Sequence, residues 1–206
     1  MKVVLVGVAG GTGSGKTTVS KKVAKGFNED ALIIEQDSYY KDISYLPFDE
    51  RKNSNFDHPK AIDFELLIKH IKDLKENKKI EKPIYDFTSH LRKEEKIKMS
   101  PKKVVIVEGI LIFAIPELRE LFDIKLFIDT DEDERLLRRI ERDMQERKRN
   151  FIGIKEQYLK TVKPMYLEFV EPSKRYADII IPRGGENTVA IKMIIAKLKK
   201  ILKDCK

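Results

Sequence analysis

The chain has 206 residues, a length typical of one α/β domain, and 41% of them are apolar, which is enough for a core. The single cysteine, Cys205, excludes a disulfide framework and a cysteine metal cluster and agrees with a cytoplasmic protein. No segment approaches the ~20 apolar residues of a membrane span, and because glycines follow Met1–Val8 we expect no secretory leader. The net charge of +8 is compatible with a nucleic acid or an anionic small substrate as the partner. Lysines are spread over the whole chain, whereas six of the eleven arginines lie between Arg135 and Arg149.

The first element is a predicted strand, Val3–Val8, that ends in a phosphate-binding motif, Gly10-x-x-x-x-Gly15-Lys16-Thr17. Glycines let backbone N–H groups curl around phosphate oxygens, and the helix predicted after Lys16 points its positive end at the same anion. Lys16 is expected to reach the β- and γ-phosphates, and Thr17 to bind Mg²⁺. A glycine turn that only precedes a helix is the weaker interpretation. We expect the nucleotide to be held by Gly10, Gly11, Thr12, Gly13, Ser14, Gly15, Lys16, Thr17 and Thr18.

Further apolar runs at 31–34, 104–107, 126–128 and 178–181 alternate with helical periodicity. They predict an α/β fold of the P-loop NTPase type, with a parallel sheet covered by helices on both faces. Ligands in such sheets bind beyond the carboxyl ends of the strands. Asp37 follows the second strand, where it is placed to accept a proton from an attacking hydroxyl or to touch Mg²⁺. A capping or turn aspartate is the simpler interpretation of that residue alone.

The segment 41–60 is predicted to be a surface loop, and a helix is expected from about residue 62 to 75. Asp57 and His58 close the loop, and both ligand contact and turn formation remain open for them.

Alternating residues on both sides of a charged turn then predict a β-hairpin at about 80–100, inserted between units of the sheet. Tyr85, Phe87 and His90 would give this hairpin an aromatic face over a flat ring, although His90 alone reads equally well as a surface histidine. The next strand, 104–107, ends in Glu108, which matches a Walker B acid and would hold Mg²⁺ or its water.

A helix over 132–149 carries Arg135, Arg138, Arg139 and Arg142 at i, i+3, i+4 and i+7, so they form one stripe. Leu136, Leu137, Ile140 and Met144 fall on the opposite face, which we expect to pack inward. We predict that 135–160 is an arginine-rich lid over phosphates, with a hinge at Asn150 and Gly153. The alternative is a surface helix whose arginines pair with Asp143 and Glu146.

The last part of the chain contains a helix over 157–170 that Pro164 is expected to interrupt, then a strand, the loop 182–187 and a helix over 188–202. Most of the apolar stripe of this last helix is expected to be core, and any excess would fit a subunit interface.

These motifs resemble the uridine kinase (uridine–cytidine kinase) family of P-loop nucleoside kinases over nearly the whole chain. The segments that carry the resemblance, besides the glycine motif, are Gln36-Asp-Ser-Tyr-Tyr40, Phe56-Asp-His-Pro59, Pro83-Ile-Tyr-Asp-Phe-Thr-Ser-His90, Glu108-Gly-Ile-Leu111, Asp129-Thr-Asp131 and Tyr176-Ala-Asp-Ile-Ile-Ile-Pro-Arg-Gly184. The resemblance implies a single kinase domain over 1–206 that transfers the γ-phosphoryl of ATP or GTP to the 5′-hydroxyl of uridine and cytidine. It also implies a cytoplasmic homotetramer in pyrimidine salvage.

The resemblance further implies roles for single residues. Asp37 would be the general base, and Mg²⁺ would lie among Thr17, Asp37 and Glu108. The residues expected to bind the nucleoside are Tyr40, Phe56, Asp57, Tyr85, Phe87, His90, Arg139, Arg149 and Gln157. The residues expected to serve catalysis or the nucleotide are Lys16, Arg135, Arg138, Arg142 and Glu186. Lys148 and Asn150 stand where relatives often have glycine and aspartate, which bears on the flexibility of the lid.

Two other enzyme or binding classes share parts of this pattern. A sugar kinase such as phosphoribulokinase would share the glycine loop and the catalytic acid, but a sugar phosphate has no ring for the hairpin aromatics to enclose. A nucleotide-switched binding protein is the second alternative, and no Asn-Lys-x-Asp guanine-reading motif occurs. We expect neither nucleic acid nor a membrane as a partner.

Overall fold

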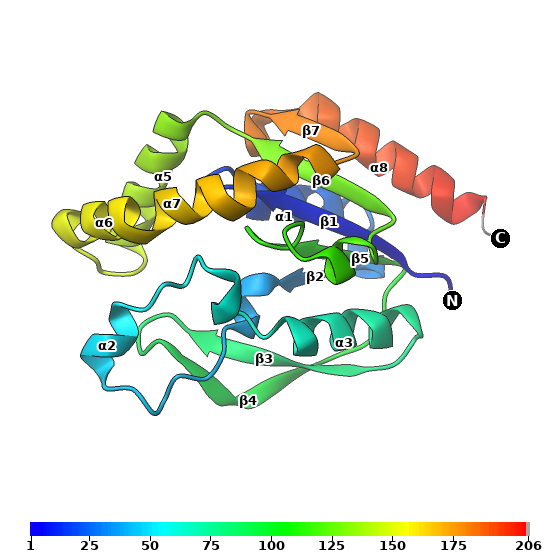
Figure 1. Ribbon diagram of the computed structural model, residues 1–206. Helices are drawn as coiled ribbons and strands as arrows, with labels where there is room; N and C mark the ends of the chain where they lie inside the picture. Colours follow the sequence, from blue (N-terminus) through cyan, green and yellow to red (C-terminus); the bar gives the residue numbers. More distant parts are fainter. Residues whose placement is uncertain (205–206) are drawn as a thin grey trace.

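The computed structural model describes residues 1–204, and its centre is a five-stranded parallel sheet (Figure 1). The strands lie in the order β2-β5-β1-β6-β7. Their bounds are Val4–Gly10 (β1), Ala31–Glu35 (β2), Val104–Glu108 (β5), Ile124–Asp129 (β6) and Ile179–Pro182 (β7). Every residue of β1 and β5 is buried, as expected of strands with helices on both sides. The predicted fold class is confirmed.

Side chains alternate along β1 between two cores, one on each face of the sheet. Val6 and its neighbours two residues away pack with α1 (Lys16–Lys25) and α8 (Thr188–Lys203). Leu5 and Ala9 pack on the opposite face with α3 (Phe64–Lys75) and with residues of the long helical segment 151–176. The period of two in a strand therefore produces the two covered faces.

The hairpin forms a separate two-stranded antiparallel sheet of β3 (Ile80–Asp86) and β4 (Leu91–Met99). Arg92 attaches it to the residues after β2, because its guanidinium donates hydrogen bonds to the carbonyl oxygens of Tyr39 (3.2 Å) and Tyr40 (3.1 Å). The hairpin thus lies beside the carboxyl end of the parallel sheet, where Figure 1 shows β3 and β4 below β2.

The segment 41–75 differs from the prediction by one added helix and otherwise agrees with it. The predicted loop contains a helix, α2 (Phe48–Lys52). His58 caps a short 3₁₀ turn, since its Nδ1 accepts from the backbone N–H of Lys60 at 3.0 Å. Helix α3 begins at Phe64, because Asp63 caps it by accepting from the N–H of Leu66.

The expected interruption at Pro164 is wrong. The chain stays helical from α6 (Phe151–Gln157) through α7 (Lys163–Met165) and on to the 3₁₀ turn 171–176, and Figure 1 shows one long helix. Wide π-helical turns at Tyr158–Val162 and Tyr166–Val170 flank the proline. Such turns alter the hydrogen-bond ladder that a proline would otherwise break.

The expected orientation of the arginine helix, α5 (Glu132–Gln145), is also wrong. Arg135 and Arg139 are each 5% exposed, whereas Leu137 is 68% and Met144 is 48% exposed. Arg135 and Arg139 face inward, where Arg139 pairs with the fully buried Asp143 of the same helix, as the alternative of pairing within the helix expects. Arg138 faces outward and pairs with Glu134, so only part of the charged stripe is turned inward. The interior of the molecule accepts these charges because they are paired.

The predicted hinge is replaced by a helix start. Asn150 caps α6 by accepting from the N–H of Gly153 at 2.8 Å, and Gly153 lies inside that helix. The chain turns instead at Lys148, whose φ is 52°.

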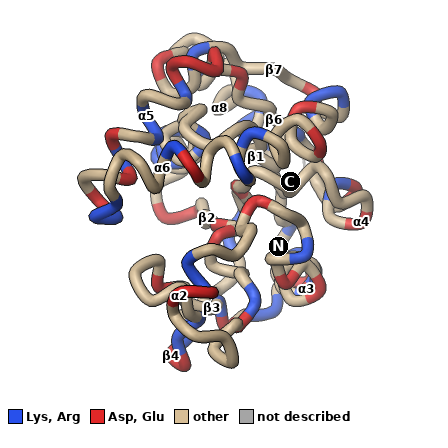
Figure 2. Tube along the Cα trace, turned by 60° about the vertical axis from the view of Figure 1, so that its left-hand side comes forward, with Lys and Arg blue, Asp and Glu red and all other residues tan. Residues whose placement is uncertain are grey.

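Basic and acidic residues are interspersed around the molecule (Figure 2). Within residues 1–204 no helix combines the length and apolar character needed to cross a membrane. Cys205 lies outside the described residues.

Candidate active site

The glycine loop between β1 and α1 has a backbone that other residues would strain. Gly10, Gly13 and Gly15 have φ values of 144°, 75° and 91°. A Cβ on Gly13 would come within 2.2 Å of the carbonyl oxygen of Arg135. No side chain caps the start of α1. Its first N–H groups are therefore available to an anion, as the phosphate-binding motif requires.

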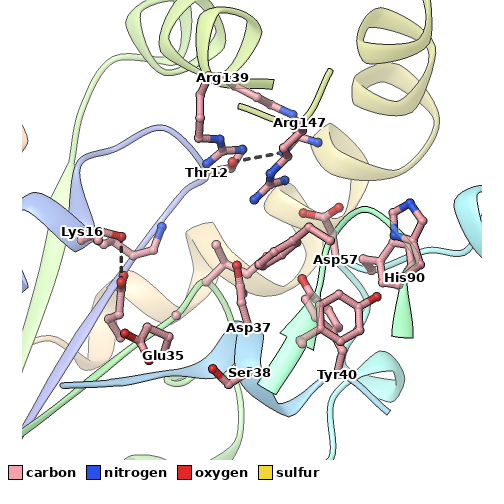
Figure 3. A pocket seen from close by; sticks show the side chains of 18 of the residues that line it. Thr12, Lys16, Glu35, Asp37, Ser38, Tyr40, Asp57, His90, Arg139 and Arg147 are labelled. Carbon is pink, nitrogen blue, oxygen red and sulfur yellow. Dashed lines mark hydrogen bonds between the residues drawn. The ribbon is translucent and has the colours of Figure 1, made fainter. Parts of the chain in front are cut away.

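A cavity of about 400 Å³ opens beside this loop (Figure 3). Its size suits a small organic molecule. The predicted site residues that line it are Thr12, Lys16, Thr17, Asp37, Tyr40, Phe56, Asp57, Tyr85, Phe87, His90, Glu108, Arg139, Arg142, Arg149 and Gln157. Figure 3 shows Asp37 between Lys16 on one side and Tyr40, Asp57 and His90 on the other.

The end of the cavity next to the glycine loop is polar. Burial lowers the pKa of Lys16 to about 8, although Glu108 and Asp37 counteract this shift. Thr17 Oγ1 donates to Glu108 Oε1 at 2.7 Å. Burial also raises the pKa of Glu108, and Lys16 opposes that rise. The two groups therefore compensate each other's loss of solvation.

The same end of the cavity fits Mg²⁺ by the chemistry of its donors. Thr17, Asp37 and Glu108 offer only oxygen atoms, which Mg²⁺ prefers. Among residues 1–204 no group of three or more His, Cys, Asp or Glu side chains is arranged to hold a metal. A magnesium ion here would therefore take most of its ligands from phosphates and water, as is usual for this ion.

The opposite end of the cavity is aromatic. The rings of Phe56 and His90 stack at 5.1 Å, and the Tyr40 and Tyr85 rings lie 4.9 Å apart. Phe87 meets Tyr85 edge to face at 5.3 Å. The Tyr85 hydroxyl is buried and has no hydrogen-bond partner in the described chain. A buried polar group of this kind calls for a ligand or a water.

Burial shifts two further groups at the aromatic end. It lowers the pKa of His90, and Arg149 and Arg147 add to this effect, so the imidazole is neutral at pH 7. It raises the pKa of Asp57, against the opposing charge of Arg139. Asp57 is 8% exposed and its carboxylate is available to accept hydrogen bonds from a ligand.

The α5–α6 segment closes the cavity from above. Arg139 donates to Thr12 Oγ1 at 3.1 Å and so connects α5 to the glycine loop. Gln157 Oε1 accepts from Arg139 at 2.9 Å and from Arg149 at 2.7 Å. The Arg139 side chain thus lies over Thr12 of the glycine loop (Figure 3).

Three predicted residues of the nucleotide site lie elsewhere. Arg135 is buried beneath the glycine loop, where its guanidinium lies 4.1 Å from the Tyr166 ring centroid and its Nε donates to the Thr130 carbonyl. Arg138 points away from the cavity and pairs with Glu134 at 2.8 Å. Glu186 has a side chain that is 78% exposed and lies 3.8 Å from Arg138. The catalytic role expected for Arg138 therefore finds no support in its position.

Sequence reasoning assigned no role to several residues that line the cavity: Glu35, Ser38, Lys82, Gly109, Ile110 and Arg147. Lys82 is 8% exposed and pairs with Glu35 at 2.5 Å. Lys82 lies two residues after Ile80 in β3, on the same buried side of the strand, and this spacing could have predicted its burial. The Arg147 guanidinium lies 4.6 Å from the Phe87 ring centroid and so joins the two ends of the cavity.

Comparisons with known proteins agree with this architecture. Residues 5–190 match the model of the Phosphoribulokinase / Uridine kinase family. The chain is 56% identical over 200 residues to a protein named uridine kinase from Clostridium botulinum, with 97% of both chains covered. It is 54% identical over 203 residues to a uridine kinase from Ligilactobacillus salivarius, with 98% of this chain and 95% of the relative covered.

Solved structures extend the likeness of fold. The phosphoribulokinase from Rhodobacter spheroides aligns with a TM-score of 0.67 at 14% identity, over 88% of this chain and 70% of that one. Identity this low bears on the fold alone. The family model and the relatives above half identity both span nearly the whole sequence, and the chain belongs to the phosphoribulokinase/uridine kinase family.

Proposed function

We propose that this protein is a uridine kinase, which transfers the γ-phosphoryl group of ATP or GTP to the 5′-hydroxyl of uridine, and of cytidine, within pyrimidine salvage. The observation that carries the proposal is that one cavity contains both a phosphate-binding end and an aromatic end. A glycine loop with Lys16 forms one end, and an aromatic enclosure around the unpartnered Tyr85 hydroxyl forms the other. Relatives above 50% identity bear the name uridine kinase, which supports the same activity.

The acceptor nucleoside would lie with its base among the aromatic side chains and its ribose beside Asp57. A flat pyrimidine suits the spacing of Tyr85, Phe87 and the Phe56–His90 pair, and the Tyr85 hydroxyl would gain a hydrogen-bond partner on the base. The Asp57 carboxylate would accept hydrogen bonds from the ribose hydroxyls. This orientation would direct the 5′-hydroxyl toward Asp37, whose side chain lies between those of Asp57 and Lys16 (Figure 3).

The chemical step needs positioning and charge neutralisation more than covalent assistance. Asp37 would accept the proton of the 5′-hydroxyl as that oxygen attacks the γ-phosphorus. The bond from the γ-phosphorus to the β,γ-bridging oxygen breaks, and ADP or GDP leaves. Lys16 and the arginines Arg139, Arg142 and Arg149 would stabilise the charge on the transferred group, in a cavity that the α5–α6 segment shields from water. Mg²⁺ held by Thr17, Asp37 and Glu108 would neutralise part of the phosphate charge.

A sugar kinase related to phosphoribulokinase is the second candidate, because that enzyme shares the fold. The aromatic end of the cavity favours the nucleoside. Five rings gather there, from Tyr40, Phe56, Tyr85, Phe87 and His90, and a sugar phosphate has no flat ring to pack against them. Arg147 and Arg149 also lie near this end, so the rings, and not a lack of cations, favour the nucleoside.

A panel of acceptors separates the two candidates. Uridine, cytidine, a purine nucleoside and ribulose 5-phosphate are each incubated with ATP or GTP, and the products are identified by mass. We expect uridine monophosphate and cytidine monophosphate, with no product from ribulose 5-phosphate. Phosphorylation of ribulose 5-phosphate without uridine turnover would overturn the proposal. By family resemblance, the chain would form a single kinase domain that uses ATP or GTP with Mg²⁺ and would work as a cytoplasmic homotetramer.

A further inference from the structure

One buried carboxylate, that of Asp143, lies behind the arginines of the cavity. Asp143 is on the inner face of α5 and its side chain is fully buried. It meets four guanidinium groups: Arg142 at 2.8 Å, Arg147 at 3.5 Å, and Arg139 and Arg149 at 3.7 Å. All four arginines line the cavity, whereas Asp143 does not. Its carboxylate therefore contacts the arginines from the protein side only.

The charge balance of this cluster favours an anionic ligand. Burial alone would raise the pKa of Asp143, but Arg139, Arg142 and Arg147 outweigh it and lower that pKa, so the carboxylate stays ionised. Asp143 then faces four cations from the protein side. Asp57 also opposes the charges of Arg139 and Arg149, and Asp37 opposes that of Arg147, so four guanidinium groups against three carboxylates leave a surplus of positive charge. Without Asp143 the guanidinium groups would repel one another at close range.

The contacts of Asp143 are of two kinds. Arg142 is fixed by two hydrogen bonds to Oδ1, from Nε at 3.0 Å and from the terminal nitrogen at 2.8 Å. Arg139 and Arg149 approach Oδ2 at 3.7 Å, which is too long for a hydrogen bond, and that oxygen has no hydrogen-bond partner among the described residues. The backbone carbonyl of Asp143 also accepts from the N–H of Arg149 at 3.1 Å.

We infer that Asp143 is a positioning residue that holds four arginines as one array and releases Arg139 and Arg149 to the phosphates of the bound nucleotide. From the protein side, the carboxylate offsets part of the arginine charge until the phosphates reach the cavity. The looser contacts of Arg139 and Arg149 can be exchanged without breaking a hydrogen bond to Asp143, whereas Arg142 keeps its two bonds. This inference rests on the proposed phosphoryl transfer.

The test replaces the charge and keeps the shape, as Asp143→Asn. Removing one negative charge makes the cavity more positive, so ATP binding measured by calorimetry at low salt tightens, by about two- to fivefold. Turnover falls at least roughly tenfold, because a misplaced arginine array stabilises the transition state poorly. A residue with a merely structural role would weaken binding and turnover together. The matched control is Asp133→Asn on the exposed side of α5, which should change neither quantity.

The double variant Asp143→Asn with Arg147→Gln removes one charge of each sign and is measured in parallel. If the single variant fails to fold, the ATP affinity and turnover of the double variant still test the inference. Its ATP affinity should return to within about twofold of the parent while turnover stays low. Weaker ATP binding in both variants, or unchanged turnover in Asp143→Asn, would overturn the inference. Wild-type turnover of uridine tests the proposed function separately, because calorimetry of ATP needs no acceptor.

Discussion

The unpartnered hydroxyl of Tyr85 makes the sharpest prediction about the acceptor end of the cavity. Tyr85 is 8% exposed, and its hydroxyl has no hydrogen-bond partner within residues 1–204. A buried hydroxyl left without a partner costs about 1–3 kcal/mol. Tyr85→Phe removes that cost from the free protein and removes a hydrogen bond from the complex. The free protein should therefore become more stable by about 1 kcal/mol, while uridine binding weakens by about 1–3 kcal/mol, or roughly five- to 150-fold.

Both effects can be measured on the same preparation. Thermal unfolding of the free protein should shift upward by about 2–4 °C, and calorimetry should report the loss of uridine affinity. Tyr39→Phe is the matched control, because the Tyr39 hydroxyl is equally buried but is paired with His70 Nδ1 at 2.9 Å. The control should lower stability and leave uridine affinity unchanged. If Tyr85→Phe instead lowers stability and keeps the wild-type affinity, the Tyr85 hydroxyl does not read the nucleoside.

Two further predictions concern the charges of the cavity. The pKa of Lys16 is about 8, and a deprotonated amine no longer attracts phosphate. We therefore expect kcat/KM for the nucleotide to fall as the pH rises above 8. A value of kcat/KM that stays constant up to pH 9.5 would contradict this. The two variants of the Glu35–Lys82 pair should lose different amounts of stability in urea unfolding. Glu35→Gln leaves a buried ammonium unpaired and should cost about 3 kcal/mol. Lys82→Met leaves a carboxylate whose side chain is 41% exposed and should cost about 1 kcal/mol. Equal costs for the two variants would show that the pair is not buried as described.

The parts of the molecule that local sequence determines were predicted correctly. The strand β1, the glycine loop and the start of α1 follow from adjacent residues, because apolar content, backbone freedom and helical spacing all act within about twenty residues. A hairpin at about 80–100 was predicted correctly, but its turn was not. The charged residues expected to form the turn lie inside β4, and the chain turns instead at residues 87–90, which include Phe87 and His90. The cavity then brings together residues from separate segments because parallel strands end at one edge of the sheet.

Helix α5 shows what periodicity leaves open. Its sequence has one apolar face and one arginine face, and the usual inference turns the apolar face inward. The inward face was instead decided by partners distant in sequence, namely the glycine loop and the Tyr166 ring, and by Asp143 on the same helix. The Glu35–Lys82 pair was missed for a similar reason, because a strand pattern does not state which residue of another strand lies opposite.

The helix through Pro164 illustrates a different difficulty. Proline removes a hydrogen-bond donor and ordinarily ends or kinks a helix. Two π-helical turns absorb this loss, and their formation depends on the packing of Tyr158 and Val170 into the interior. Such packing is a property of the folded chain and leaves no local signal in the sequence.

The most direct test of the central claim is the single-turnover conversion of uridine to uridine monophosphate by the variant Asp37→Asn. The amide keeps the size of the side chain but cannot accept the proton of the 5′-hydroxyl. We expect the single-turnover rate to fall by about 10²–10⁴-fold, with ATP and uridine still bound at near wild-type affinity. A variant that turns over at near the wild-type rate with unchanged nucleotide binding would contradict the assignment of Asp37 and with it the proposed phosphoryl transfer.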